Sequence, residues 1–162
     1  EEAARPEKYY EPPLINIIKF ACNACPEKSF HVTDMCQGCL AHPCVEVCPN
    51  RANISIRVPG MEKHQIIHVD YLCNECGNCR SFCPYDSAPY LDKFTLFADE
   101  KDMEDSKNQG FAVLDAASVK CKVRFFGETY VWTKGEETRI PDGLLKLMET
   151  VISDYTYLLR QE

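Results

Sequence analysis

The chain has 162 residues, 45% of them hydrophobic and 10% aromatic, which is enough for one ordinary folded domain or two small ones. Its formal net charge of −7 disfavours nucleic acid and anionic lipid as partners. Eleven cysteines is a high and odd number, and many form C-x-x-C pairs. This usage favours metal ligation in a reducing compartment over a secreted disulfide framework, so we expect a cytoplasmic protein.

Residues 1–31 are expected to form an N-terminal extension. They begin EEAARPEKYY without an initiator methionine, which is consistent with a piece of a longer protein. The longest apolar run, residues 14–20, is broken by Asn16 and Lys19 and is far too short to span a bilayer. We therefore expect no membrane insertion.

Cys22 and Cys25, within this extension, have the spacing of a metal-binding pair. Two thiolates do not complete a site, so we interpret them as small thiols that pack. The alternatives are a third metal, with ligands from His31 or a neighbouring segment, and a redox disulfide. We leave both cysteines off the ligand list and predict that changing both to serine leaves the iron content unchanged.

One cysteine pattern then occurs twice, in residues 36–49 (CQGCLAHPCVEVCP) and residues 73–84 (CNECGNCRSFCP). The second copy is C-x2-C-x2-C-x3-C-P, and the first has two additional residues between its second and third cysteines. Three thiolates on one tight loop can hold three corners of a [4Fe–4S] cube. The fourth thiolate, one helical turn later, faces away and is free to ligate the cluster of the other half. The following proline ends the short helix and turns the chain away.

The pattern therefore predicts two [4Fe–4S] clusters with crossed ligation. The predicted ligands are Cys36, Cys39, Cys44 and Cys83 for cluster I, and Cys73, Cys76, Cys79 and Cys48 for cluster II. Structural zinc is the alternative, because four thiolates also bind zinc tetrahedrally. Zinc sites usually separate two C-x-x-C pairs by a longer loop and have no need of a third cysteine followed by C-P. Iron–sulfur clusters are therefore favoured.

Several residues around the two loops are candidates for supporting roles. Gly38 and Gly77 lie inside the loops, where backbone N–H groups must approach the cluster sulfides closely. Tyr71 and Tyr85 flank the second loop, where they either shield a cluster from water or pack as core aromatics. His42, inside the first loop, either tunes a cluster by hydrogen bonding or simply packs. The other histidines show no ligand spacing.

Two β-hairpins are expected outside the cysteine loops. Residues 53–58 alternate apolar and polar positions and residues 65–69 return after a turn, which predicts a hairpin between the loops. Residues 119–126 alternate in the same way, and residues 129–133 are the expected partner strand. Cys121 shares the apolar face of its strand, so we interpret it as a buried structural thiol.

The last part of the chain ends in a predicted amphipathic helix that opens at Pro141 and Asp142. Its expected buried positions are Leu144, Leu147, Met148, Val151, Ile152, Tyr155, Leu158 and Leu159. Residues 90–110 run from a mixed apolar segment into an acidic one, which we interpret as a solvated helix or loop, with a docking surface as the alternative. Residues 91–162 are thus expected to be a small appendage of one β-hairpin and one helix.

No motif for nucleotide binding or hydrolysis is present. The sequence contains no G-x-G-x-x-G, P-loop or H-E-x-x-H motif, and no catalytic site is evident. The visible chemistry is one-electron transfer.

Residues 32–90 resemble the two-cluster bacterial ferredoxins through the repeated C-x2-C…C-x3-C-P pattern. The resemblance implies an α+β, ferredoxin-like domain with pseudo-twofold β-hairpins and short helices. Residues 48–162 are more specifically similar to the C-terminal end of the selenate reductase iron–sulfur flavoprotein family. The similarity runs from CPNRANISIRVPG through CNECGNCRSFCPYDSAPYLDKFTLF to SKNQGFAVLD and the terminal helix. It implies electron transfer between pyridine nucleotide, flavin and a partner such as a molybdenum enzyme.

Residues 12–49 instead resemble the ferredoxin segment of monomeric iron-only hydrogenases, although the hydrogenase active-site motifs are absent. Both resemblances imply two [4Fe–4S] clusters and differ in the partner. We favour an electron-transfer domain or subunit of a larger oxidoreductase, with a flavoprotein or a molybdenum- or iron-dependent enzyme as partner. The alternatives are a hydrogenase relay segment and a catalytic piece whose active site residues 91–162 complete.

Overall fold

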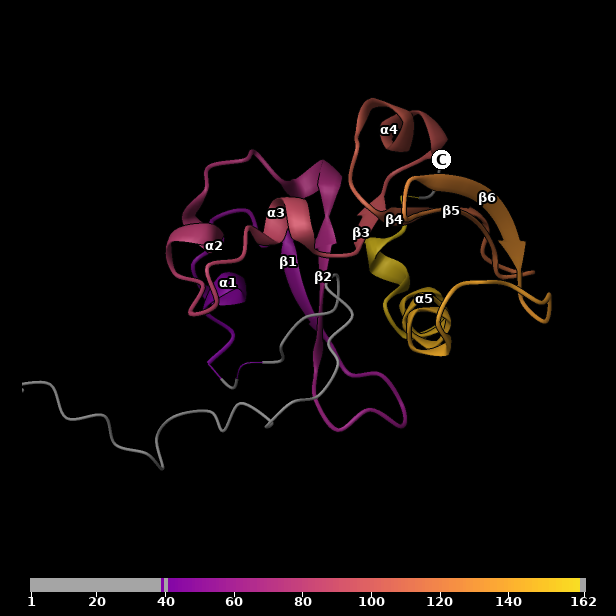
Figure 1. Ribbon diagram of the computed structural model, residues 1–162, viewed down its shortest axis with the longest axis horizontal. Coiled ribbons are helices and arrows are strands. Elements are labelled where there is room, and N and C mark those ends of the chain that lie inside the picture. The colour runs from indigo at the N-terminus through magenta and orange to yellow at the C-terminus, as the bar shows by residue number, and fades with distance from the viewer. Residues whose placement is uncertain (1–38, 40, 161–162) are drawn as a thin grey trace, which may run out of the picture. The chain divides into compact units, whose positions relative to one another are not determined.

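A computed structural model describes Cys39 and residues 41–160 of the chain (Figure 1). In this part of the chain, six strands form one sheet in the order β1-β2-β3-β4-β5-β6. Strands and short helices alternate along the sequence, which confirms the predicted α+β class. Within the same residues, no helix combines the length and the apolar character that crossing a membrane requires.

The elements are short apart from the last helix. The strands are β1 (Asn53–Ile56), β2 (Gln65–Val69), β3 (Thr95–Phe97), β4 (Gly110–Asp115), β5 (Lys120–Phe125) and β6 (Glu128–Thr133). The helices are α1 (Pro43–Glu46), α2 (Asn78–Ser81), α3 (Pro89–Asp92), α4 (Glu100–Asp105) and α5 (Asp142–Asp154), with 3-10 turns η3 (Asp70–Leu72) and η4 (Thr156–Leu158).

Both predicted hairpins are present, and strand β3 joins them into one sheet. Strands β1 and β2 pair antiparallel, as do β4 with β5 and β5 with β6. Strand β3 pairs parallel with β2 on one side and with β4 on the other. The connection from β2 to β3 carries the second cysteine loop. The predicted boundaries at 31/32 and 90/91 stay predictions, but residues on both sides of position 90 belong to this sheet.

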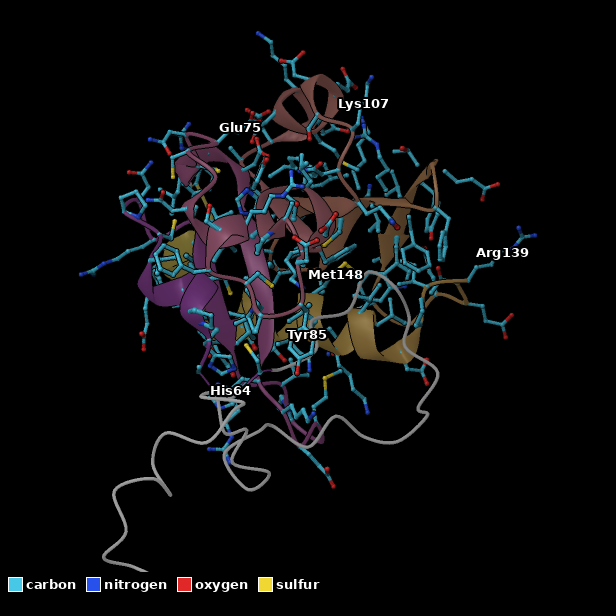
Figure 2. All side chains as sticks on the ribbon, turned by 60° about the vertical axis from the view of Figure 1, so that its left-hand side comes forward. His64, Glu75, Tyr85, Lys107, Arg139 and Met148 are labelled. Atoms are coloured by element: carbon cyan, nitrogen blue, oxygen red, sulfur yellow. The ribbon has the colours of Figure 1, made fainter. Side chains whose placement is uncertain are left out.

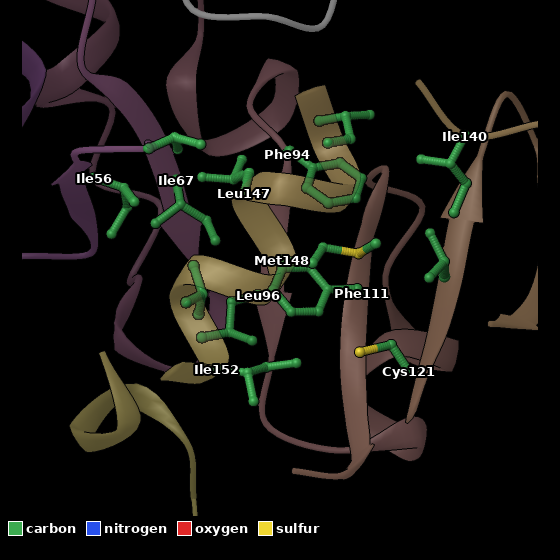
Figure 3. Close-up of a cluster of buried hydrophobic side chains, with 14 of the residues drawn as sticks. Ile56, Ile67, Phe94, Leu96, Phe111, Cys121, Ile140, Leu147, Met148 and Ile152 are labelled. Atoms are coloured by element: carbon green, nitrogen blue, oxygen red, sulfur yellow. The ribbon is translucent and has the colours of Figure 1, made fainter. Parts of the chain in front are cut away.

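The main core lies between one face of the sheet and helix α5 (Figure 3). Alternate strand residues point to opposite faces, so Ile67, Leu96 and Phe111 reach this core from three neighbouring strands. Leu147 and Met148 of α5 pack onto them. Burying each such side chain contributes roughly 1.5–3 kcal/mol, so this core holds the sheet together independently of the cysteine loops.

Smaller clusters cover the opposite face of the sheet. Ile66 of β2 packs with Cys44 of α1 and Cys79 of α2, whereas its neighbour Ile67 belongs to the main core. Phe97 of β3 packs with Met103 of α4. Helices α1 and α2 therefore lie on the face of the hairpin that α5 does not cover, and this arrangement is visible in Figure 1.

The terminal helix begins where the sequence predicts and ends earlier. Its predicted buried positions are buried as far as Ile152. The extension of the helix to Leu159 is wrong, because α5 ends at Asp154 and a 3-10 turn follows over Thr156–Leu158. Leu158 is nevertheless buried, so the helical pattern identified a core residue outside the helix.

Candidate functional site

The first cysteine loop leads into helix α1 through a left-handed residue. His42 has φ 41° and caps the helix, Pro43 follows it, and Cys44 is the second helical residue. Cys39 and Cys44 are buried, and Cys48 is partly buried. Cys36 and Gly38 lie outside the described residues. Of the cysteines predicted to bind cluster I, the structure therefore describes Cys39, Cys44 and Cys83.

The second cysteine loop repeats this local geometry. Gly77 has φ 77°, caps helix α2, and places Cys79 as the second helical residue, as His42 does for Cys44. The equivalent turn bonds also form, from Val45 N–H to the His42 carbonyl at 2.9 Å and from Arg80 N–H to the Gly77 carbonyl at 3.1 Å. The repeat seen in the sequence is therefore a repeat of backbone structure.

The C-P dipeptides form matching turns after each helix. Arg51 N–H donates to the Cys48 carbonyl at 3.2 Å, and Asp86 N–H donates to the Cys83 carbonyl at 3.2 Å. Arg51 and Asp86 both have φ 54°, an unusual conformation for side chains larger than glycine. Each proline thus occupies the second position of a tight turn that redirects the chain, as the sequence predicts.

The thiol of Cys48, in the first loop, influences the thiol of Cys73, in the second, electrostatically. Burial is the main cause that raises the pKa of Cys73, and the neighbouring thiols of Cys48 and Cys79 raise it further. The hydrogen bond from Glu75 N–H acts in the opposite direction and lowers the pKa of Cys73.

Backbone N–H groups point at two of these sulfur atoms. Ala52 N–H donates to Cys48 Sγ at 3.2 Å, and Glu75 N–H donates to Cys73 Sγ at 3.2 Å. Donors of this kind stabilise a thiolate and are among the features that set iron–sulfur potentials. No disulfide links the described cysteines.

Among Cys39 and residues 41–160, no three His, Cys, Asp or Glu side chains converge closely enough to hold a single metal ion. A cubane cluster has a different requirement, because its four thiolates bind four separate iron corners. Cysteines without disulfides and the N–H donors to Cys48 and Cys73 suit thiolate ligation of that kind.

The surface beside the second loop is acidic. Burial raises the pKa of Asp70, and the nearby carboxylates of Asp102 and Glu75 raise it further. Asp102 lies in α4, and Glu75, labelled in Figure 2, lies in the second cysteine loop. Negative charge here disfavours adding an electron nearby, because like charges repel.

Two cysteines of the predicted cluster II reach the surface. Cys76 is exposed, in contrast to the buried Cys79. Cys48 lines a cavity of about 1110 Å³ together with Tyr71 and Arg160. Cluster II would therefore have close access to solvent or to a partner.

The tyrosines that flank the second loop have different environments. Tyr71 packs against the main core and donates its hydroxyl to the Leu158 carbonyl at 2.7 Å. The Arg160 guanidinium lies 4.8 Å from the centre of its ring. These contacts agree with the packing alternative for Tyr71, whereas Tyr85 is 40% exposed.

The described histidines also differ. His42 lies 6.0 Å from the His64 ring, and its pKa is lowered by burial and, to a smaller extent, by His64. His68 is 1% exposed in strand β2, and burial lowers its pKa to about 4. No local pattern singles out His68, because its hydrogen-bond partner Asn53 lies in another strand.

Cys121 is the buried structural thiol that the sequence predicts. It is fully buried in the main core, and burial raises its pKa to about 12, so it stays a protonated thiol. Cys22, Cys25 and His31 lie outside the described residues, and their interpretation stays a prediction.

The candidate site thus consists of two cysteine loops of the same backbone geometry on an α+β scaffold. Comparison with known proteins finds similarity to proteins named as oxidoreductases. No family model and no solved structure matches the chain. Two curated proteins do, both named "Putative oxidoreductase YgfK". The protein of Escherichia coli (strain K12) is 41% identical over 123 residues, and that of Escherichia coli O157:H7 is 40% identical over 123 residues.

The matched region covers 72% of this chain and 12% of each relative. The chain thus spans about an eighth of the length of the oxidoreductases that it resembles. It is similar to one segment of a much larger protein.

Proposed function

We propose that this chain binds two [4Fe–4S] clusters and transfers electrons, one at a time, as a domain or subunit of a larger oxidoreductase. The observation that carries the proposal is the repeated loop geometry, which places Cys44 and Cys79 at equivalent positions of α1 and α2 in one buried cluster with Ile66. Crossed ligation further requires Cys48 and Cys83 each to reach the other loop, whereas two independent zinc sites would keep their cysteines local.

The proposed ligands of cluster I are Cys36, Cys39, Cys44 and Cys83, and those of cluster II are Cys73, Cys76, Cys79 and Cys48. When bound, each cluster supplies a one-electron redox couple whose potential depends on hydrogen bonds to sulfur and on exposure to solvent. The chain contributes N–H donors from Ala52 and Glu75 and excludes water around Cys44 and Cys79.

The proposed partner is the remainder of the oxidoreductase. The chain corresponds to a small part of its relatives, so the parts that bind substrate lie elsewhere. The resemblance of residues 48–162 to selenate reductase iron–sulfur flavoproteins supports a flavin or molybdenum centre as the electron partner. The hydrogenase alternative depends on residues 12–49, most of which lie outside the described residues, and gains no support from them.

Reductive titration of anaerobically reconstituted protein tests this function. We expect dithionite to bleach the visible absorption reversibly and to produce electron paramagnetic resonance signals from two reduced clusters. Cys79→Ala should remove the signal of one cluster. Cys121→Ala is the matched control, because it removes a buried thiol from the main core, and both signals should remain. Protein with no reducible absorption would overturn the proposal.

A further inference from the structure

Two polar side chains are buried between strands β1 and β2, on the face that carries the cysteine helices. Asn53 and His68 are directly opposite in the register of the hairpin, and each is 1% exposed. Both side chains lie on the same face of the hairpin as Ile66, which packs with Cys44 and Cys79. Apolar residues suit such positions better, so this buried pair requires a specific role.

The pair forms a chain of hydrogen bonds that ends on a predicted ligand. His68 Nδ1 lies 3.1 Å from Asn53 Oδ1, and Asn53 Nδ2 donates to the Cys44 carbonyl at 3.1 Å. Because the side-chain amide N–H of Asn53 donates to the Cys44 carbonyl, Asn53 Oδ1 is the atom that faces His68, and it can only accept. His68 therefore carries its proton on Nδ1, and both residues are held in one orientation.

These two hydrogen bonds meet the backbone at the end of helix α1. In a continuing helix, the Cys44 carbonyl would accept from the N–H of Cys48, four residues on. Here the side-chain amide of Asn53 donates to the Cys44 carbonyl instead. The last backbone hydrogen bond of the helix runs from Val47 N–H to the Pro43 carbonyl at 2.9 Å. Cys48 then lies beyond the helix, at the start of the turn that the Arg51 N–H closes on the Cys48 carbonyl.

The second half of the repeat ends its helix without such a pair. There, Cys83 N–H donates to the Arg80 carbonyl at 3.1 Å, which tightens the last turn. The hydrogen-bond chain from β2 through β1 to a cysteine carbonyl is thus a feature of the first loop, and it distinguishes the surroundings of cluster I from those of cluster II.

We propose that Asn53 and His68 are positioning residues of cluster I, which fix the Cys44 backbone and thereby set the reduction potential of that cluster. The inference rests on the proposed function, because it assumes that Cys44 is a ligand. Neither residue is among the proposed ligands. Their effect is transmitted through the carbonyl dipole and the orientation of the Cys44–Cys48 segment.

The test compares midpoint potentials of the reconstituted full chain, followed by electron paramagnetic resonance. His68→Leu removes the donor to Asn53, whereas His68→Asn keeps an N–H group near the place of Nδ1. The control is Asn108→Leu, because Asn108 Nδ2 also donates to a backbone carbonyl of a short helix, that of Tyr90 at 2.8 Å. The cluster I signal is the one that Cys39→Ala abolishes.

We expect His68→Leu to keep both clusters and to shift the reduction equilibrium of cluster I about tenfold, which is 59 mV for a one-electron couple. His68→Asn should restore most of the wild-type potential, and Asn108→Leu should leave it unchanged. A wild-type potential in His68→Leu, or the same shift in Asn108→Leu, would overturn the inference alone. Wild-type protein that binds no iron would overturn the proposed function and the inference together.

Discussion

Cys44 and Cys79 occupy the same position, the second residue, of two four-residue helices, and both pack on Ile66 of strand β2. Each helix follows a residue with positive φ, His42 at 41° and Gly77 at 77°. One apolar strand residue thus separates the two candidate cluster sites. Strand β2 therefore contacts the helices of both loops.

Crossed ligation predicts the outcome of removing the fourth cysteine of each motif. Cys48→Ala should resemble Cys73→Ala, since both damage cluster II, and Cys83→Ala should resemble Cys39→Ala. Each variant is expected to lose about four irons. Electron paramagnetic resonance of the remaining cluster distinguishes the pairs. If Cys48→Ala instead gives the spectrum of Cys39→Ala, the ligation is local to each loop.

Cluster removal should unfold the cysteine loops before the rest of the sheet. Without iron, closely spaced thiols have no ligand to hold them, so residues 41–52 and 70–92 should lose protection from hydrogen exchange. Helix α5 packs on a core without any predicted ligand, and its amides should remain protected. Hydrogen exchange of the chelated protein measures this. Equal loss of protection in α5 and in the loops would contradict it.

Gly110 is predicted to be required for the pairing of β3 with β4. A Cβ atom at this position would lie 2.1 Å from the Thr95 carbonyl oxygen, which is backbone and cannot rotate away. Gly110→Ala should therefore lower the free energy of unfolding by about 3 kcal/mol. Gly60→Ala is the control, with open space around Cβ but φ +82°, and should cost only about 1 kcal/mol. Urea denaturation compares the two, and equal losses would contradict the steric argument.

Buried His68 predicts that stability falls as the solution becomes acidic. Its pKa is about 4 in the folded chain against 6.5 for the exposed side chain, so the unfolded state binds more protons between these values. The contribution of neutral His68 to the free energy of unfolding is therefore fully present above pH 6.5, and it is lost as the pH falls towards 4. Between pH 7 and pH 5 the loss should be about 2 kcal/mol.

Comparison with His68→Leu isolates this contribution from that of other titrating groups. The variant removes the histidine, so its free energy of unfolding should depend less steeply on pH over the same interval. Parallel pH profiles for the wild type and His68→Leu would show that His68 is not the cause.

Local sequence patterns predicted two of the three antiparallel pairings, β1 with β2 and β5 with β6, but not strand β4 or its pairing with β5. Alternation over residues 53–58 and 119–126, each followed by a turn and a partner strand, is a short-range signal that two hairpins satisfy. The start of α5 was predicted for the same reason, because Pro141 precedes a regular apolar face. The cysteine spacing likewise predicted the repeated loops and the turn after each C-P.

The connection between the hairpins was not predicted. Strand β3 has three residues, all buried, and shows no alternation of apolar and polar positions that a sequence could reveal. Its parallel partners are distant in sequence, with a cysteine loop on one side and α4 on the other. The acidic segment of residues 90–110 therefore contains a buried strand as well as the expected solvated helix, α4.

Asn53 was missed for a related reason. Its role depends on His68 across the hairpin and on the carbonyl of Cys44 in a separate helix, and no local spacing records such a triplet. The available signal was an asparagine at the start of an isoleucine-rich strand, where strand propensity disfavours it.

Metal and sulfide analysis of anaerobically prepared protein tests the central claim most directly. Two [4Fe–4S] clusters predict about eight irons and about eight acid-labile sulfides per chain. Fewer than about four irons, together with stoichiometric zinc and no labile sulfide, would contradict the assignment and would show that the paired cysteine loops bind zinc.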